Sequence, residues 1–308
     1  MASAFPFSAS AKAFDGTVLL SVDGGTTVWA FPGANVQITD TDNIGRPDVI
    51  DASEISHIEV PGVRMGNLSF AAYLMPDRGF DTFLTAAFGA RTNQQLTPFI
   101  YTIIPSGGAA AMSGTGLWFS RVTVAGSFGI SGQQAMNMIR LSATIIDVDN
   151  VYAATALTAP ATVGLNGLGA SSFDNSSVTN GAATPVVYDK IHSYSLTLDN
   201  QLAVIPGIVN QGARLAAGCQ PGPLRGALTL EQLANSAFPL PGVRGQFALS
   251  LRLPTGDNSK KFTINTNVSR DGSSENLVPN DFISRGQIYS VFGTNANTGG
   301  WLFSTSFV

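Results

Sequence analysis

The chain has 308 residues and a formal net charge of −4, with 12 % charged and 44 % hydrophobic residues. Because soluble monomers usually carry about a quarter charged residues, this composition indicates either a membrane protein or a chain that buries much of its surface against other subunits. The apolar runs are far shorter than the ~18–20 residues that a membrane-spanning helix needs. We therefore expect no membrane insertion, and self-association explains the low charge best.

The distribution of charges and cysteines excludes further classes of partner. Lys260-Lys261 is the only adjacent pair of cations, so no focused positive patch is available to bind nucleic acid. Cys219 is the single cysteine, which excludes a disulfide within the chain and, with only two histidines, argues against a structural zinc site. The N-terminal segment Met1–Gly16 lacks the long apolar core of a secretion signal, so we expect no export by that route.

Strands dominate the predicted elements, and the first two form a hairpin. Thr17–Val22 and Thr26–Phe31 are rich in β-branched and aromatic residues and flank the turn sequence Asp23-Gly24-Gly25. Many later segments alternate apolar and polar residues, which is typical of half-buried strands. These further predicted strands are Asn35–Thr39, Asn67–Leu74, Phe99–Ile104, Leu117–Val124 and Ile139–Val148 in the first half, and Ser193–Leu198, Gly226–Leu230, Gln246–Leu253, Lys261–Val268 and Gln287–Phe292 in the second.

Two segments have the spacing of a helix with one apolar face. The pattern predicts helices over Asp77–Phe88, with Asp77 as the N-cap, and, from a weaker signal, over Leu230–Phe238. Between the halves, residues 151–185 are rich in Ala, Gly, Ser, Thr and Asn, and Asp174 is their only charged residue. This composition predicts a long, extended connector that lies on a protein surface.

Matching segments indicate that the two halves are related. Pro61–Phe70 (PGVRMGNLSF) matches Pro221–Leu230 (PGPLRGALTL), and Val36–Thr39 matches Leu196–Asp199. Both matches have the same spacing of 160 positions, from 61 to 221 and from 36 to 196, which favours a duplication. The sequence thus predicts a mainly β fold of two tandem sandwich-like or barrel-like domains, residues 1–150 and 187–308, each with one short flanking helix and joined by the connector 151–186.

No group of residues has the spacing of a catalytic site. His57 lies near Glu54 and Glu59, an arrangement open to a general base, but a surface or interface histidine is favoured because nothing else converges there. His192 is interpreted in the same way. We therefore predict no catalytic residue, no cofactor and no metal ion, and a protein that is not an enzyme.

The acidic residues also have a simpler interpretation than metal binding. Asp40, Asp42 and nearby Asp48 resemble the start of a calcium loop, but no glutamate closes a 12-residue loop. A solvated turn is therefore favoured. Asp147 and Asp149 would share one face at a strand end, where protecting the sheet edge is favoured over binding a cation.

The aromatic residues and the cysteine are interpreted as structural. Trp29, Trp118 and Trp301 could form sugar-binding platforms, but tryptophans in strands are more often core or interface residues. Cys219 has no base beside it in the sequence and is expected to be inert.

The repeated order of strand, long loop, PGxxxGxL strand start, helix and three strands resembles that of the tail tube proteins of long-tailed bacteriophages. The type VI secretion tube protein shares their fold. The resemblance covers Val36–Val148 and Ser193–Phe292 and implies domains that pair sheets with their neighbours in a ring, with the helices on the outer side. By position, Asp40–Val60 and Asn200–Gln220 would be long loops bridging stacked rings, and Met1–Gly16 would be an arm. The hairpin and the connector are departures that the family does not require.

The resemblance also implies partners and a location. Two domains per chain would let three copies close a pseudo-sixfold ring, and stacked rings would form a tube with other tail proteins at its ends. DNA would pass through the lumen without specific binding. The protein would belong to the virion, in the phage tail, after assembly in the host cytoplasm. The alternatives are another virion shell or decoration protein, a secreted carbohydrate-binding or hydrolytic β-sandwich, and, least favoured, an outer-membrane barrel.

Overall fold

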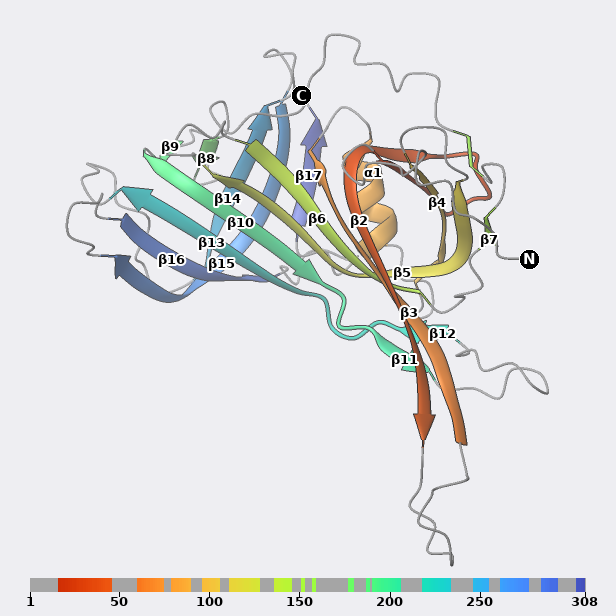
Figure 1. Cartoon of the computed structure of the whole chain (residues 1–308). Helices are drawn as coiled ribbons and strands as arrows, with labels where there is room; N and C mark the ends of the chain where they lie inside the picture. The colour runs from red at the N-terminus through yellow and green to blue at the C-terminus, as the bar shows by residue number, and fades with distance from the viewer. Residues whose placement is uncertain are drawn as a thin grey trace, which may run out of the picture.

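The computed structural model describes residues 16–45, 60–74, 79–89, 96–105, 111–127, 136–145, 151–152, 157–158, 177–179, 187–188, 190–205, 218–233, 246–254, 261–276, 284–292 and 303–307. Most of these residues form one sheet of 15 strands, beside a separate two-stranded sheet and one short helical segment. The mainly β class predicted from the sequence is therefore confirmed. Figure 1 shows the large sheet as a twisted band that curls up at the end formed by the first half of the chain.

The main path through the large sheet runs β4-β1-β2-β3-β6-β5-β10-β13-β16-β15-β14-β8-β9, with β7 added on β5 and β17 on β15. Neighbouring strands pair antiparallel throughout. The strands of the first half are β1 (Gly16–Ser21), β2 (Trp29–Gly45), β3 (Val60–Tyr73), β4 (Phe99–Ile104), β5 (Met112–Ser127), β6 (Met136–Ile145) and β7 (Val151–Tyr152). Those that follow are β8 (Ser177–Thr179), β9 (Val187–Tyr188), β10 (Ile191–Asp199), β11 (Ala203–Ile205), β12 (Gly218–Gln220), β13 (Arg225–Leu233), β14 (Gln246–Pro254), β15 (Lys261–Asn276), β16 (Ser284–Phe292) and β17 (Phe303–Phe307).

The first half closes into a six-stranded barrel. Its strands pair in the order β4-β1-β2-β3-β6-β5, and β4 also pairs with β5 to complete the circle. The closing strands β1 and β4 have 6 residues each, whereas β2 has 17 and β5 has 16. Parts of β2 and β5 therefore extend beyond the strands that close the barrel.

The predicted hairpin is confirmed, because β1 pairs with the first residues of β2. Its turn carries Gly24 and Gly25 with φ of 70° and 99°, a backbone conformation that glycine adopts without steric cost. A carboxylate oxygen of Asp23 accepts the backbone N–H of Thr27 at 2.8 Å, and the hydroxyl oxygen of Ser21 accepts the backbone N–H of Gly25 at 2.9 Å. The bond from the Thr27 N–H is the main reason why the pKa of Asp23 lies below its usual value.

The first predicted helix is present and anchors the core. Helix α1 (Phe80–Leu84) continues into a π-helical turn, η4 (Thr85–Gly89), whereas its predicted cap, Asp77, lies outside the described residues. The carbonyl of Gly79 accepts the backbone N–H of Phe83 at 3.0 Å and begins the helix. The side chain of Phe83 is fully buried, and its ring contacts those of Trp29, Phe31, Phe80, Phe99 and Phe119.

The second predicted helix, Leu230–Phe238, is wrong in its described part. Residues as far as Leu233 belong to β13, and residues 234–238 lie outside the described ranges. Leu228, Leu230 and Gln232 are buried in strict alternation, and the backbone of β13 pairs with β10 on one side and β16 on the other. A strand paired on both sides satisfies all of its backbone groups, which outweighs a weak helical spacing.

One hydrophobic core runs through both halves. The same cluster of buried side chains includes Phe83 and Leu117 from the first half and Leu228 and Tyr289 from the second. Helix α1 lies close to β17, the last described strand of the second half. Parts of the predicted connector also enter the fold, because β7 and β8 lie within it and Leu157 is buried.

Candidate functional site

The feature that organises the molecule is a strand-pairing pattern that occurs twice. In the first half β2 pairs with β3, β3 with β6, β6 with β5, and β5 with both β4 and β7. In the second half β10 pairs with β13, β13 with β16, β16 with β15, and β15 with both β14 and β17. The strands occur in the same chain order in both halves, so every pairing of the first set has a counterpart in the second.

A β-bulge at the same place in both sets fixes how they correspond. In β5 the register shifts between Phe119 and Arg121, opposite Ala143 of β6. In β15 it shifts between Arg270 and Gly272, opposite Tyr289 of β16. Bulges are retained features of related folds. We call residues that face one another across four neighbouring strands a row. The bulge therefore matches one row of the first half with one row of the second, Ile38–Leu68–Ala143–Phe119 with Leu196–Leu228–Tyr289–Arg270.

With this correspondence, one sequence match falls at equivalent strand positions and the other is displaced. Leu68 and Leu228 both follow the PG motif and are separated by 160 positions, as the sequence predicted. Ile38 corresponds to Leu196, a spacing of 158 (38 to 196), so the predicted match of Val36 with Leu196 is displaced by two residues. A displacement of two keeps every side chain on its own face of a strand, so the alternating pattern alone does not distinguish the two alignments.

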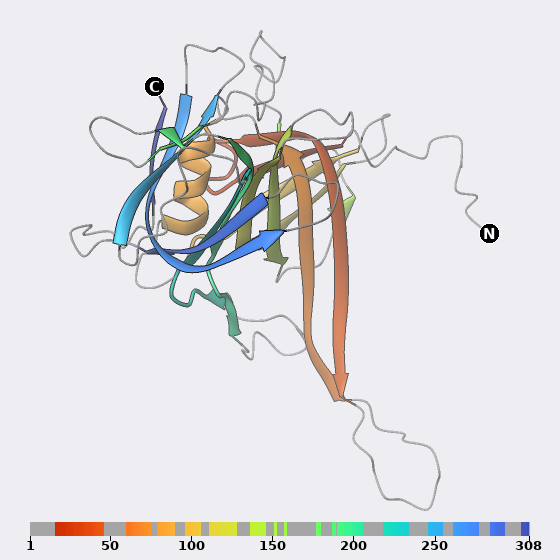
Figure 2. The same cartoon turned by 90° about the vertical axis from the view of Figure 1, so that its left-hand side faces the viewer.

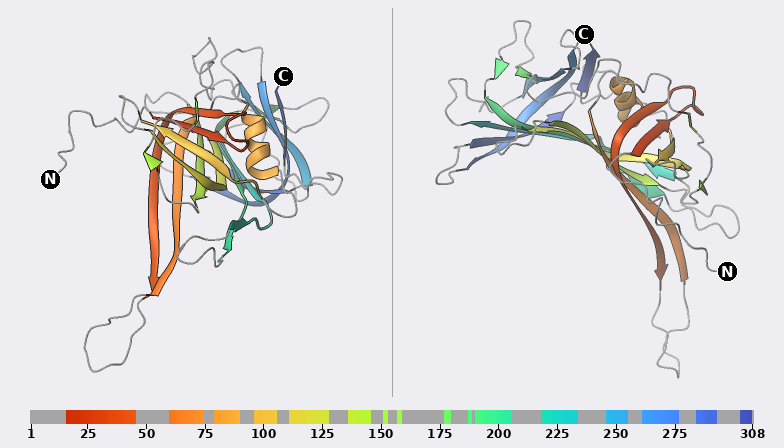
Figure 3. Two further views of the ribbon diagram at one scale, coloured as in Figure 1. Left: turned by 90° about the vertical axis from the view of Figure 1, so that its right-hand side faces the viewer. Right: turned by 45° about the horizontal axis from the view of Figure 1, so that its top comes forward.

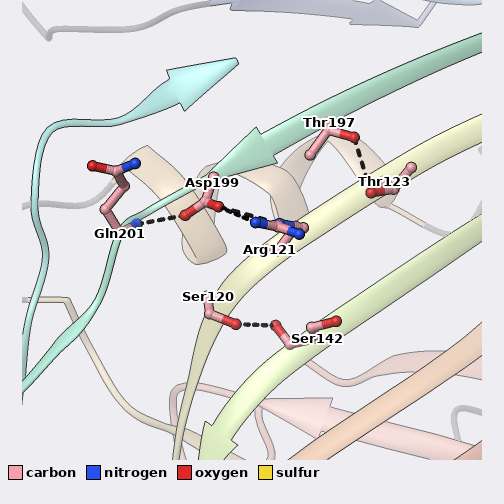
Figure 4. A network of polar contacts seen from close by, with 7 residues as sticks. All are labelled: Ser120, Arg121, Thr123, Ser142, Thr197, Asp199 and Gln201. Carbon is pink, nitrogen blue, oxygen red and sulfur yellow. Dashed lines mark hydrogen bonds and ion pairs between the residues drawn. The ribbon is translucent and has the colours of Figure 1, made fainter. Parts of the chain in front are cut away.

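The two sets are joined edge to edge by β5 and β10, as Figure 4 shows. The hydroxyl groups of Thr123 and Thr197 lie 3.1 Å apart across this joint. The guanidinium group of Arg121 donates to one carboxylate oxygen of Asp199 from Nε at 3.1 Å and from a terminal nitrogen at 2.8 Å. The Arg121 side chain is 57 % exposed, so this ion pair favours the register more than it stabilises the fold.

Asn200 holds the end of β10 against the first half. Its side-chain amide is buried and donates to the carbonyl of Phe119 at 2.8 Å and to the carbonyl of Ala87 at 2.9 Å. Its backbone N–H donates to the carbonyl of Ser120, the extra residue of the bulge, at 2.8 Å. The bulge in β5 and the π-helical turn are thereby both tied to the joint.

Two long stretches of sheet edge have no partner strand among the described residues. The outer edge of β2 pairs with β1 only as far as Ala34, so the edge of residues 35–45 is open with respect to the described strands. The outer edge of β15 pairs with β14 only as far as Ser269, and no other described strand pairs with its edge at residues 271–276. An unpaired edge presents a row of N–H and C=O groups that can pair with another chain. These two edges are the candidate functional site.

Two strand pairs also project from one side of the sheet. β2 and β3 stay paired from Thr41, which faces Met65, to Gly45, which faces Val60. Figure 2 shows them as a long two-stranded arm. In the second half β11 and β12 form a shorter pair at the corresponding position. The predicted loops Asp40–Val60 and Asn200–Gln220 are therefore paired strands at their described ends, while residues 46–59 and 206–217 lie outside the described ranges.

The two faces of the band differ in character. One face is buried in the core, as Leu68, Val122 and Leu196 show. The opposite face, which we call the open face, carries mainly small polar side chains at the alternate positions. Figure 3 shows the backbone of the arched band from two further sides. Among the described residues of β3, β5, β6, β10 and β13, the charged side chains on the open face are Arg121, Arg140, Asp199, Arg225 and Glu231.

The residues considered for chemistry are not brought together where they are described. His57, Glu54, Glu59 and Asp48 lie outside the described residues, as do Asp147 and Asp149. Asp40 and Asp42 belong to strand β2, so the predicted solvated turn is wrong there, because this stretch pairs with β3. Within the described ranges, no group of three or more His, Cys, Asp or Glu residues is placed to hold a metal ion.

His192 and Cys219 occupy structural positions. The imidazole Nδ1 of His192 lies 3.4 Å from a carboxylate oxygen of Glu231, which also accepts the hydroxyl of Ser193 at 2.8 Å. Cys219 is buried beside Trp118, and this burial raises the pKa of its thiol to about 11. A thiol with this pKa remains protonated at neutral pH, which makes it a poor nucleophile.

Of the described tryptophans, Trp29 is buried in the core and Trp118 is partly buried beside Cys219. The indole N–H of Trp29 donates to the hydroxyl of Thr82 at 3.0 Å, and the residue is only 5 % exposed. The indole N–H of Trp118 donates to the carbonyl of Leu96 at 3.1 Å. The burial of Trp29 leaves no ring face for a sugar to stack on. Trp301 lies outside the described residues.

The pairing geometry and the open edges are the features from which a function can be argued. The described part of the chain contains no helix with the length and apolarity needed to cross a bilayer. A comparison with protein-family models and one with curated proteins found nothing that matches this chain.

Proposed function

We propose that the protein is a structural virion protein that polymerises into stacked rings and forms the tail tube of a long-tailed bacteriophage, the conduit for DNA delivery. Each chain contributes two consecutive tube domains, residues 1–150 and 187–308, joined by the connector 151–186. Three chains close a ring of pseudo-sixfold symmetry. The observation that carries the proposal is the edge-to-edge joint between β5 and β10, which links two similar sets of strands.

This joint has the form that neighbours in a ring require. A sheet edge pairs with another edge through its backbone, and a closed ring leaves no such edge free. Within one chain, β5 and β10 already join one strand set to the next in this way. Burial of the remaining edges between copies also accounts for the low proportion of charged residues, 12 % of the chain.

The projecting strands are consistent with contacts between stacked rings, and the open face is consistent with the wall of a tube lumen. The β2–β3 arm extends well beyond the body of the sheet (Figure 2) and can reach a ring above or below. The open face would line the lumen. Its few described charges are of both signs, with Asp199 paired to Arg121, so the surface offers DNA no strongly attractive patch.

Negative-stain electron microscopy of the purified, concentrated chain tests this function. We expect rings or stacked tubes with a central pore and threefold or pseudo-sixfold symmetry. Spherical or flat lattices would instead favour a virion shell or decoration protein. Monodisperse monomers at every concentration, also in the presence of preformed tube ends, would contradict the proposal.

A further inference from the structure

We propose that copies of this chain join by pairing the open edge of β2 with the open edge of β15 of the next copy, antiparallel and in the register of the internal β5–β10 joint. The inference rests on the proposed function, because it specifies which edges meet between the copies of one ring. It follows from the strand correspondence within a single chain.

The strands of the internal joint are the counterparts of the two open edges. β10 corresponds to β2, because each is the first strand of its set and pairs with the strand that contains the second glycine of the PGxxxG motif, Gly226 in β13 and Gly66 in β3. β5 corresponds to β15, because each carries the bulge and pairs with the last long strand of its set. The outer edge of β10 is occupied by β5. The same edge of β2 has no described partner beyond Ala34.

The correspondence also gives the register. In the internal joint Thr197 faces Thr123, and Asp199 faces Arg121. Thr197 corresponds to Thr39, because each directly follows the matched residue of its strand, Leu196 in β10 and Ile38 in β2. Thr123 corresponds to Ser274, because each lies two residues after the first paired residue beyond the bulge, Arg121 in β5 and Gly272 in β15. Thr39 of one copy would therefore face Ser274 of the next.

The exposure of the described side chains fits a missing neighbour. On β2, Val36 and Ile38 point to the core side and are only half-buried, although both contact the core cluster. Their counterparts on β10, Tyr194 and Leu196, are 3 % and 1 % exposed because β5 covers that edge. A strand placed beside β2 would bury Val36 and Ile38 in the same way, which is favourable at roughly 25 cal/mol for each Å² of apolar surface removed from water.

Several other described edge strands are short. β7 and β9 have 2 residues each, and β11 and β12 have 3 each. The open edges of β2 and β15 are singled out because they are the counterparts of the edges that pair inside the chain. The charge pair of the internal joint has no equivalent, because the positions that correspond to Asp199 and Arg121 hold Thr41 and Gly272. The Arg121–Asp199 ion pair is therefore particular to the internal joint between β5 and β10.

Cysteine crosslinking of the full-length chain tests the register. The variant Thr39→Cys/Ser274→Cys places thiols at the proposed contact, where the internal counterparts Thr123 and Thr197 have side-chain oxygens 3.1 Å apart. Thr123→Cys/Thr197→Cys is the positive control and should form a disulfide within one chain. Gln37→Cys/Ser274→Cys is the control displaced by two residues, a separation at which the thiols are too far apart for ready bonding. Buried Cys219 contributes little background, which the single variants measure.

The results expected from mild oxidation of the assembled protein are specific. Thr39→Cys/Ser274→Cys should lose its monomer band on non-reducing gels and give covalent multimers, and the displaced pair should remain monomeric. Rings or tubes that form without this crosslink, or that crosslink equally through the displaced pair, would overturn the inference and leave the proposed function standing. Crosslinked multimers without rings or tubes would support the edge pairing and contradict the tail tube. A chain that neither assembles nor crosslinks, although its Thr123→Cys/Thr197→Cys control closes normally, would overturn both.

Discussion

At the scale of single residues, the second glycine of the repeated PGxxxG motif has a packing role. Gly226 faces Val291 on the neighbouring strand β16, and a Cβ atom at Gly226 would lie 2.8 Å from the Val291 Cβ. Gly66 of the first motif faces Ile145 of β6 in the corresponding position. Each glycine therefore stands opposite a buried β-branched side chain.

We expect Gly226→Ala to destabilise the fold. Overpacking of this kind costs typically about 1–3 kcal/mol, and the neighbouring atoms here belong to a β-branched side chain that cannot rotate away freely. Gly272→Ala is the matched control, because a Cβ at Gly272 would meet no atom within 4 Å. Thermal unfolding followed by circular dichroism should show a lower Tm for Gly226→Ala alone. Equal Tm values for the two variants would contradict this role.

The sequence could identify these glycines but not their purpose. The motif was visible as a repeat because Pro61–Phe70 and Pro221–Leu230 share residue types at fixed positions. The opposing residues, Ile145 and Val291, are distant in the chain and become neighbours only through strand pairing. For the same reason the residues of the joint, Arg121 with Asp199, carried no sequence signal as a pair.

At the scale of elements, the end of β10 decides how firmly the two strand sets are held together. Asp199 and Asn200 are adjacent, but Asp199 makes a partly exposed ion pair, whereas the amide of Asn200 is buried and bonds to two carbonyl groups. A buried carbonyl left without a partner costs about 1–3 kcal/mol, whereas an exposed ion pair contributes at most about 1 kcal/mol.

We therefore expect Asn200→Ala to lower the free energy of unfolding by several times more than Asp199→Ala. Urea denaturation of the unassembled chain, followed by tryptophan fluorescence, measures both. Asp199 also accepts the backbone N–H of Gln201 at 2.7 Å. A larger loss for Asp199→Ala would therefore show that the ion pair and this bond together, and not the buried amide, hold β10 against the bulge of β5.

Element prediction succeeded where local patterns are strong. Phe99–Ile104 was predicted with the bounds that β4 has, and the apolar face of the first helix is buried as expected. The second helix was wrong because the alternation of β13 is supported by partners on both sides. The sequence also divided β2 into two strands, Thr26–Phe31 and Asn35–Thr39, because Pro32-Gly33 usually interrupts a strand. In the structure β1 ends its pairing there while β3 begins, so β2 continues through the change of partner.

At the scale of the whole molecule, strand order was predictable and strand partnership was not. The composition pointed to buried surface between copies, and the repeated order of elements pointed to two related halves. Neither shows that β5 and β10 join the halves in one sheet, or that one core serves both. Backbone pairing carries no residue-specific signal, so the joint and the two open edges emerge only from the fold.

The mass of the assembled ring tests the central claim most directly. If each chain supplies two ring positions, native mass spectrometry of single rings should give three times the 32.0 kDa of one chain, and averaged images of the same sample should show six similar lobes. A ring of six chains, or a ring whose number of lobes equals its number of chains, would contradict the account.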